Sequence, residues 1–194
     1  MALMIIGMIV FLGSHLLPAF PRARAALAGR LGEVGYKALF AVVALAGIVA
    51  LVAGYGDWRA AGSPLIYDPP TWARHLTLLL MLPVFPLIVA AYAPVGRIKA
   101  AVRHPMILAV KVWALAHLFA NGDLASLLLF LGFLAWGVID RISLKRREAA
   151  GVVTVDTAGP ARNDVVPIVA GLVVYGLFVW KLHMWLIGVP VLLG

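Results

Sequence analysis

Long apolar runs, separated by short polar connections, make up most of this 194-residue chain. A helix needs about 20 predominantly apolar residues to cross a hydrocarbon layer about 30 Å thick. The pattern predicts an all-α polytopic membrane protein, with six transmembrane helices in one bundle and residues 1–194 forming a single domain. The predicted helices cover residues of about 2–20, 36–56, 71–93, 104–120, 123–140 and 165–187.

Proline and turn-forming residues shape the third to fifth predicted helices. Pro83 and Pro86 should kink the third, because proline lacks a backbone N–H and clashes with the preceding turn. Residues 120–123, Ala-Asn-Gly-Asp, are typical of a tight turn, with Asp123 as the N-cap of the fifth helix. The fourth and fifth helices should therefore form an antiparallel hairpin.

Composition supports the membrane assignment. The chain is 64% hydrophobic and 12% charged, with a mean hydropathy of +1.04, whereas soluble domains are about half apolar and a quarter charged. The net charge of +8 does not require a nucleic-acid partner, because its placement follows the positive-inside rule.

The basic residues divide unequally between the two sides of six alternating spans. Twelve lie in or beside the connections after the first, third and fifth helices, and two, Arg59 and Arg74, lie on the other side. The twelve are Arg22, Arg24, Arg30, Lys37, Arg97, Lys99, Arg103, Arg141, Lys145, Arg146, Arg147 and Arg162. We therefore expect a multi-pass protein of the bacterial inner membrane with both termini on the periplasmic side, and the lipid bilayer as its main partner.

The chain contains no cysteine. This excludes disulfides, thiolate metal ligands, a covalent c-type haem link and a cysteine nucleophile. Imidazole is therefore the first candidate ligand for a metal or haem. The sequence also shows no Ser-His-Asp arrangement, phosphate-binding glycine loop or paired carboxylates, which argues against hydrolysis and phosphoryl transfer.

The fourth predicted helix carries polar residues inside an apolar segment. Trp113, His117 and Asn121, spaced four apart, form one stripe, while His104 and Lys111 form another. Ionisable groups are costly in hydrocarbon and usually mark a buried site. The simpler alternative for each such histidine is an interhelical hydrogen bond, which contributes about 0.6–2 kcal/mol.

Depth along the helices limits which histidines can meet. At about 1.5 Å per residue, His15 lies about 18 Å from the outer end of its helix, and His117 lies about 10 Å below the outer surface. This difference of about 8 Å permits a shared iron, given helix tilt and kinks. His75 is a depth-compatible competitor, and His183 lies near the outer interface. His104 is about 20 Å along the helix from His117, so these two cannot bind one iron.

Several motifs resemble the NnrU family, whose broader membership includes the zeta-carotene isomerase of plants and cyanobacteria. The most specific are Arg103-His104-Pro105-Met106 and the following Trp113-Ala114-Leu115-Ala116-His117. Gly13-Ser14-His15 and the run from Gly32-Glu33 to Phe40 also match. The resemblance covers most of the chain up to about residue 140.

In the isomerase branch, the resemblance implies a non-covalent haem b held by two histidines, which correspond here to His15 and His117. Trp113, one turn from His117, would pack against the porphyrin, with ordinary helix packing as the alternative. Arg103 and His104 would bind haem propionates or lipid phosphate at the inner interface. The implied reaction is redox-dependent cis–trans isomerisation of an apolar, polyene-like small molecule.

Two other functions remain open. The amino-acid sequence of Trp113–Asp123 resembles the NnrU branch more closely than the isomerase branch. The NnrU branch is associated with nitrite and nitric oxide reduction in denitrification, so this resemblance implies an accessory factor for that process. Arg-His-Pro before an apolar helix also resembles isoprenylcysteine and phospholipid methyltransferases, where it helps to form an S-adenosylmethionine site. Here Met106 and Ile107 replace the usual aromatic residue, and no paired glutamates follow in the expected context.

Overall fold

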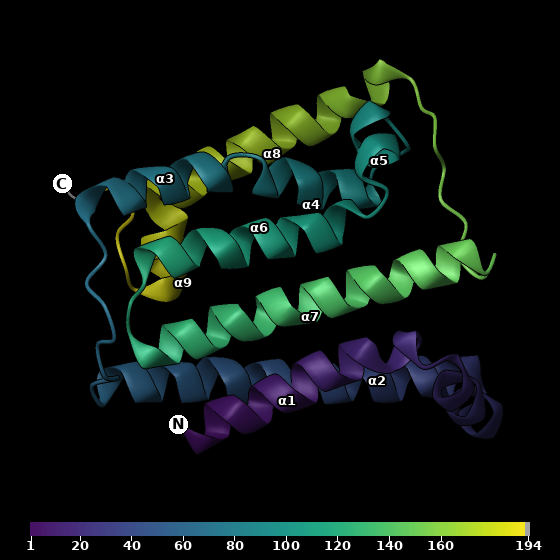
Figure 1. Cartoon of the computed structure of the whole chain (residues 1–194), viewed down its shortest axis with the longest axis horizontal. Helices are drawn as coiled ribbons and strands as arrows, with labels where there is room; N and C mark the ends of the chain where they lie inside the picture. Colours follow the sequence, from purple (N-terminus) through teal and green to yellow (C-terminus); the bar gives the residue numbers. More distant parts are fainter. Residues whose placement is uncertain (193–194) are drawn as a thin grey trace. The chain divides into compact units, whose positions relative to one another are not determined.

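The computed structural model describes residues 1–192, and helices dominate them. Five helical segments are long and apolar enough to cross a membrane, so the chain is a multi-pass helical membrane protein (Figure 1). A sixth apolar helix, α6 (Pro105–Ala120), has 16 residues and is shorter than these. The five longer segments are Ala2–Ala19, Pro21–Ala60, Thr71–Tyr92, Leu124–Ala149 and Ala161–Ile187.

The chain divides into two compact units, which are described one after the other. Unit 1 contains Met1–Pro69 and Asn121–Arg146, and unit 2 contains Pro70–Ala120 and Arg147–Gly194. Unit 1 holds α1 (Ala2–Leu16), α2 (Pro21–Ala60) and most of α7 (Leu124–Ala149).

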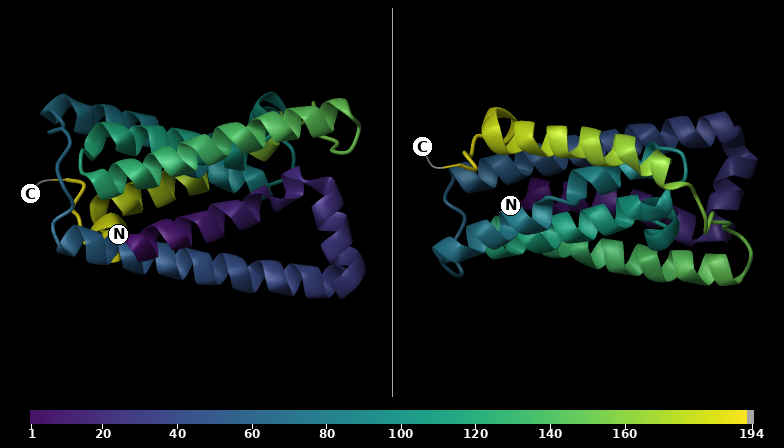
Figure 2. Two further views of the ribbon diagram at one scale, coloured as in Figure 1. Left: turned by 60° about the horizontal axis from the view of Figure 1, so that its bottom comes forward. Right: turned by 90° about the horizontal axis from the view of Figure 1, so that it is seen from above.

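The beginning of α2 differs from the sequence prediction. Residues 21–31 are helical where a connection was expected, because Ala, Leu and Arg favour helix and Pro21 starts the helix with a suitable φ. Gly32, with φ 71° and ψ 163°, then breaks the helix. Figure 2 shows this first segment crossing away from the end of α1 before the rest of α2 runs back alongside α1.

Glycines let α1 and α2 approach closely as an antiparallel pair. A Cβ atom at Gly47 would lie 2.7 Å from the backbone nitrogen of Phe11. A Cβ at Gly54 would collide with the backbone nitrogen of Met4 in the same way. Small residues at such positions permit the backbone contact that drives helix association in lipid. On α7, Ala125 completes this core with Met4 and Leu51.

The N-terminus of α7 is capped as the sequence predicted. The Asp123 carboxylate accepts hydrogen bonds from the Ser126 backbone N–H, at 3.1 Å, and from the Ser126 hydroxyl, at 2.5 Å. Leu65 pairs with Asp123 in an antiparallel bridge that ties the preceding loop to this turn. At its other end, α7 runs to Ala149, beyond the predicted end at residue 140, since Leu, Lys, Arg, Glu and Ala all favour helix.

In unit 2, the kink predicted in the third helix is confirmed at Pro83, whereas Pro86 lies within the first turn of α4 (Val84–Tyr92). Thr71–Met81 (α3) and α4 are separate helices, and Pro83 lies between them. The last predicted helix, 165–187, is also interrupted, by a π-helical turn at Phe178–Leu182. The other helices of the unit are α5 (Arg97–Val102), α6, α8 (Val165–Leu177) and α9 (His183–Ile187).

Close packing and capping hold unit 2 together. Val84, Leu87 and Ala109 form its buried core, which joins α4 to α6. The buried Asp164 carboxylate accepts hydrogen bonds from the backbone N–H groups of Arg97, at 2.9 Å, and Ile98, at 3.2 Å, at the start of α5. This pairing satisfies helix-terminal donors that would otherwise be left without partners.

Candidate functional site

His15, in the last turn of α1, lies among aromatic rings of unit 1. Its ring centroid is 4.3 Å from that of Phe11 and 5.2 Å from that of Phe40. Its Nδ1 lies 2.8 Å from the Phe11 carbonyl oxygen. A carbonyl only accepts, so Nδ1 carries the proton and Nε2 is the basic nitrogen of the ring. This is the tautomer in which a histidine can bind a metal through Nε2.

A buried donor without a partner lies next to His15. The indole N–H of Trp136 is buried and makes no hydrogen bond among residues 1–192. The Trp136 ring meets His15 edge-on, with centroids 6.2 Å apart. A buried, unpaired N–H costs about 1–3 kcal/mol, so such a group calls for an explanation, for example an acceptor that is not part of the chain.

His117, in the last turn of α6, repeats the arrangement in unit 2. Its Nδ1 lies 2.9 Å from the Trp113 carbonyl oxygen, so this ring also has a basic Nε2. The Trp113 and His117 ring centroids are 5.5 Å apart, as expected for two residues one turn apart on the same helical stripe. Asn121 lies just beyond the end of α6 at Ala120, so the helical stripe stops at His117.

The structure adds His183 to this group. Its ring is nearly parallel to that of His117, at 21°, with centroids 6.5 Å apart. The Nδ1 of His183 lies 2.7 Å from the Val189 carbonyl oxygen, which again leaves Nε2 basic. The depth estimated from the sequence placed His183 near the outer interface. That estimate could not show that His183 lies beside His117.

The other histidines lie in different surroundings. His75 is exposed on α3. His15 belongs to unit 1, whereas His117 and His183 belong to unit 2. Within residues 1–192, no group of three or more His, Asp or Glu side chains is arranged to hold a metal ion.

Arg103 and His104, at the start of α6, share one carboxylate. Glu148 accepts from Arg103 Nη1 at 3.0 Å and pairs with His104 Nε2 at 2.5 Å. The Glu148 and His104 side chains are only 11% and 14% exposed. The backbone of Arg103 has a φ of 63°, which a non-glycine residue rarely adopts. The sequence prediction missed Glu148, because it lies near the end of α7, in a run that looked like a polar loop.

Comparison with known proteins identifies a family for this chain. No curated protein and no solved structure matches the chain. The family model of the NnrU protein matches residues 3–191, nearly the whole chain. The chain therefore belongs to the NnrU protein family.

Proposed function

We propose that this chain is a membrane haem b protein whose iron is held by His15 and His117. One observation carries the proposal: each ring donates its Nδ1–H to the carbonyl one turn earlier, in Phe11 and Trp113 respectively. Metal-binding histidines commonly donate this second N–H to a backbone carbonyl, which orients the ring and raises the basicity of Nε2. With no cysteine in the chain, two neutral imidazoles are a donor set that suits haem iron.

The surroundings of both rings fit a flat, largely apolar group. Phe11, Phe40 and Trp136 surround His15, and Trp113 lies beside His117. When bound, haem iron supplies one-electron redox chemistry, which the protein tunes through its ligands and their surroundings. The chain's own groups orient the imidazoles and exclude water, and the Trp136 indole offers a hydrogen-bond donor.

We propose that such a site serves redox-dependent cis–trans isomerisation of an apolar, polyene-like molecule that enters from the bilayer. In this proposal α6 is a sixth span, so that the twelve basic residues near the ends of spans face the cytoplasm and both termini face the periplasm of an inner membrane. Arg103 and His104 lie at the cytoplasmic end of α6, where Arg103, with a side chain 47% exposed, is accessible to a haem propionate or a lipid phosphate.

Absorption spectroscopy of the purified protein tests the haem proposal. Membranes from cells supplied with a haem precursor should yield protein with a Soret band and a pyridine haemochrome spectrum of haem b. His15→Ala and His117→Ala should each convert a low-spin spectrum to a high-spin one or abolish it. His75→Ala, at an exposed histidine of α3, serves as the control that should leave the spectrum unchanged. Wild-type protein without haem would overturn the proposal, and unchanged spectra in His15→Ala or His117→Ala would overturn that ligand.

An isomerisation assay distinguishes the proposed enzyme from an accessory factor of denitrification. Reduced, haem-loaded protein in liposomes should convert a cis-polyene to its trans isomer, resolved by chromatography, and His117→Ala should not. If the wild-type protein does not convert the polyene and its deletion lowers nitrite or nitric oxide reduction in the host, the accessory role is supported instead.

A second candidate, a membrane methyltransferase, gains support from Glu148. The Arg103-His104 pair resembles a methyltransferase motif that requires acidic partners, and Glu148 supplies one carboxylate. Calorimetric titration with S-adenosylmethionine tests this candidate. Saturable binding that Glu148→Gln abolishes would favour it, whereas no heat of binding in the wild-type protein would exclude it.

A further inference from the structure

The first segment of α2, residues 21–31, is a short basic helix set off from the rest of unit 1. We call it the elbow helix. It follows Phe20, begins with Pro21 and ends where Gly32 breaks α2. The left view of Figure 2 shows it crossing between the end of α1 and the long part of α2. A helix that crosses between the ends of two membrane-spanning helices is suited to lie along the membrane surface.

The three arginines of the elbow helix have different surroundings. Arg24 is paired with neighbouring side chains of α2: its Nη2 lies 3.2 Å from both Glu33 carboxylate oxygens, and its guanidinium lies 5.3 Å from the centre of the Tyr36 ring. Arg22 and Arg30 are exposed and make no ion pair with the residues that the structure describes. At 100° per residue these two lie about 80° apart on one side of the helix, away from Arg24.

Small residues separate the two exposed arginines. Ala26 and Gly29 lie between them on the same side of the helix and are exposed. A Cβ atom added at Gly29 would meet no atom within 4 Å. This face therefore carries two positive charges with no large side chain between them, so a bulky anionic group can approach both.

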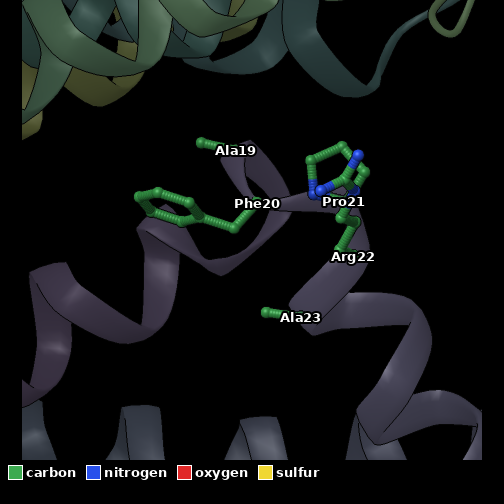
Figure 3. Close-up of a pocket in the computed structure, with 5 residues that line it drawn as sticks. All are labelled: Ala19, Phe20, Pro21, Arg22 and Ala23. Atoms are coloured by element: carbon green, nitrogen blue, oxygen red, sulfur yellow. The ribbon is translucent and has the colours of Figure 1, made fainter.

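Apolar side chains flank this basic face at both ends. Phe20 is 61% exposed before the elbow helix, and Val34 is 83% exposed after it. Figure 3 shows the open hollow lined by Ala19–Ala23, with the Phe20 ring and the Arg22 side chain extending to different sides of the chain. Basic residues flanked by aromatic and aliphatic anchors are typical of helices that lie in the membrane interface.

We infer that the elbow helix binds the headgroups of anionic phospholipids in the surrounding bilayer. Arg22 and Arg30 contact the lipid phosphates, while Phe20 and Val34 insert into the upper acyl layer. Charge complementarity identifies the lipid, because the outward face carries two cations and no carboxylate. Each basic residue near an anionic leaflet adds to this attraction, which falls off within a Debye length.

Lipid binding to the whole protein tests the inference. In native mass spectrometry from mixed phosphatidylglycerol and phosphatidylcholine, the protein should retain phosphatidylglycerol preferentially. The double variant Arg22→Gln, Arg30→Gln should reduce that preference about 30-fold. Lys145→Gln with Arg146→Gln is the matched control, since it removes two exposed charges from another basic segment. Equal losses in both double variants would overturn a specific site, as would displacement of the lipid by free inorganic phosphate.

Spin labels measure the depth of the elbow helix independently. The chain has no cysteine, so single substitutions Phe20→Cys, Ala26→Cys and Val34→Cys each give one label. In anionic vesicles, labels at 20 and 34 should be relaxed more by oxygen, and the label at 26 more by a water-soluble nickel complex. This difference in depth between the labels at 20 and 34 and the label at 26 should be smaller in phosphatidylcholine vesicles. Full exposure of all three labels to the nickel complex in anionic vesicles would overturn the inference.

Discussion

His104 and Glu148, 44 residues apart in sequence, meet through a 2.5 Å contact between Nε2 and Oε1. The same carboxylate binds Arg103, so the largely shielded Glu148, next to the last residue of α7, links this helix end to the start of α6. A carboxylate that receives two charge-assisted contacts is a strong link, and removing it leaves two donors without their acceptor.

Replacing this carboxylate should destabilise the protein. Glu148→Gln is expected to lower the free energy of unfolding by about 1–3 kcal/mol, because hydrogen bonds to charged groups contribute this much when they are shielded from water. Thermal unfolding in detergent measures the change. Glu33→Gln is the control, because the Arg24–Glu33 pair is exposed on both sides and such pairs contribute about 0–1 kcal/mol. Equal effects of the two variants would contradict the assigned importance of Glu148.

The Asp123 cap should make stability depend on pH in the acid range. Burial raises the pKa of Asp123, but hydrogen bonds from Ser126 and Ser63 and the nearby Arg59 outweigh it, so the pKa lies below its ordinary value. The stabilisation is therefore complete above the unfolded pKa, near 3.9, and is lost as pH falls through the lower folded pKa.

The variant Asp123→Asn isolates this contribution. At neutral pH it should unfold at a lower denaturant concentration than the wild type, by about 0.5–2 kcal/mol, as expected for a helix cap. The two proteins should converge in stability as pH falls below 4. A constant difference across the acid range would show that the carboxylate charge is not responsible.

The close contact between α1 and α2 predicts a sharp difference between two neighbouring glycines. Gly54→Ala should destabilise the protein by about 1–3 kcal/mol, because its Cβ would press on the backbone of Met4. Gly56→Ala, where a Cβ meets nothing within 4 Å, should be neutral or stabilising by up to about 1 kcal/mol. Thermal melting of both variants checks the contrast, and similar losses in both would refute the packing assignment.

The break in α2 depends on one residue. Gly32 has a φ of 71° and a ψ of 163°, a region that is costly for residues with a side chain, so Gly32→Ala should cost about 1–3 kcal/mol. Gly29→Ala, in the elbow helix with open space around it, should increase stability slightly. If Gly32→Ala were as stable as the wild type and left the spin-label depth at residue 20 unchanged, the break would not require glycine.

The sequence predicted the membrane class, the Pro83 kink and the Asp123 cap, because each follows from local composition or from one residue's backbone chemistry. It did not predict the elbow helix, because three arginines near a proline suggested a connecting loop. The high helix propensity of the Ala, Leu and Arg residues in this segment favours the helix instead. Five segments meet the length of a span, and α6, which ends at the predicted turn, has only 16 residues and is shorter than these.

The candidate site was predictable only in part. The contact of Trp113 with His117 follows from helical spacing and is present. The neighbours His183 and Glu148 are distant in sequence from the residues they meet, and no periodicity connects them. A π-helical turn directly before His183 changes the face that this residue presents, and such a turn has no clear sequence signature. The assignment of His15 as a partner of His117 stays a prediction.

The length of α6 has a consequence for access to His117. Sixteen residues extend about 24 Å at 1.5 Å per residue, against a hydrocarbon layer of about 30 Å. In the proposed six-span arrangement, the bilayer thins locally around so short a helix. His117 lies one turn from the end of α6, so the thinning shortens its distance to the periplasmic water. An electron carrier in that compartment would then need to transfer charge across only a thin apolar layer.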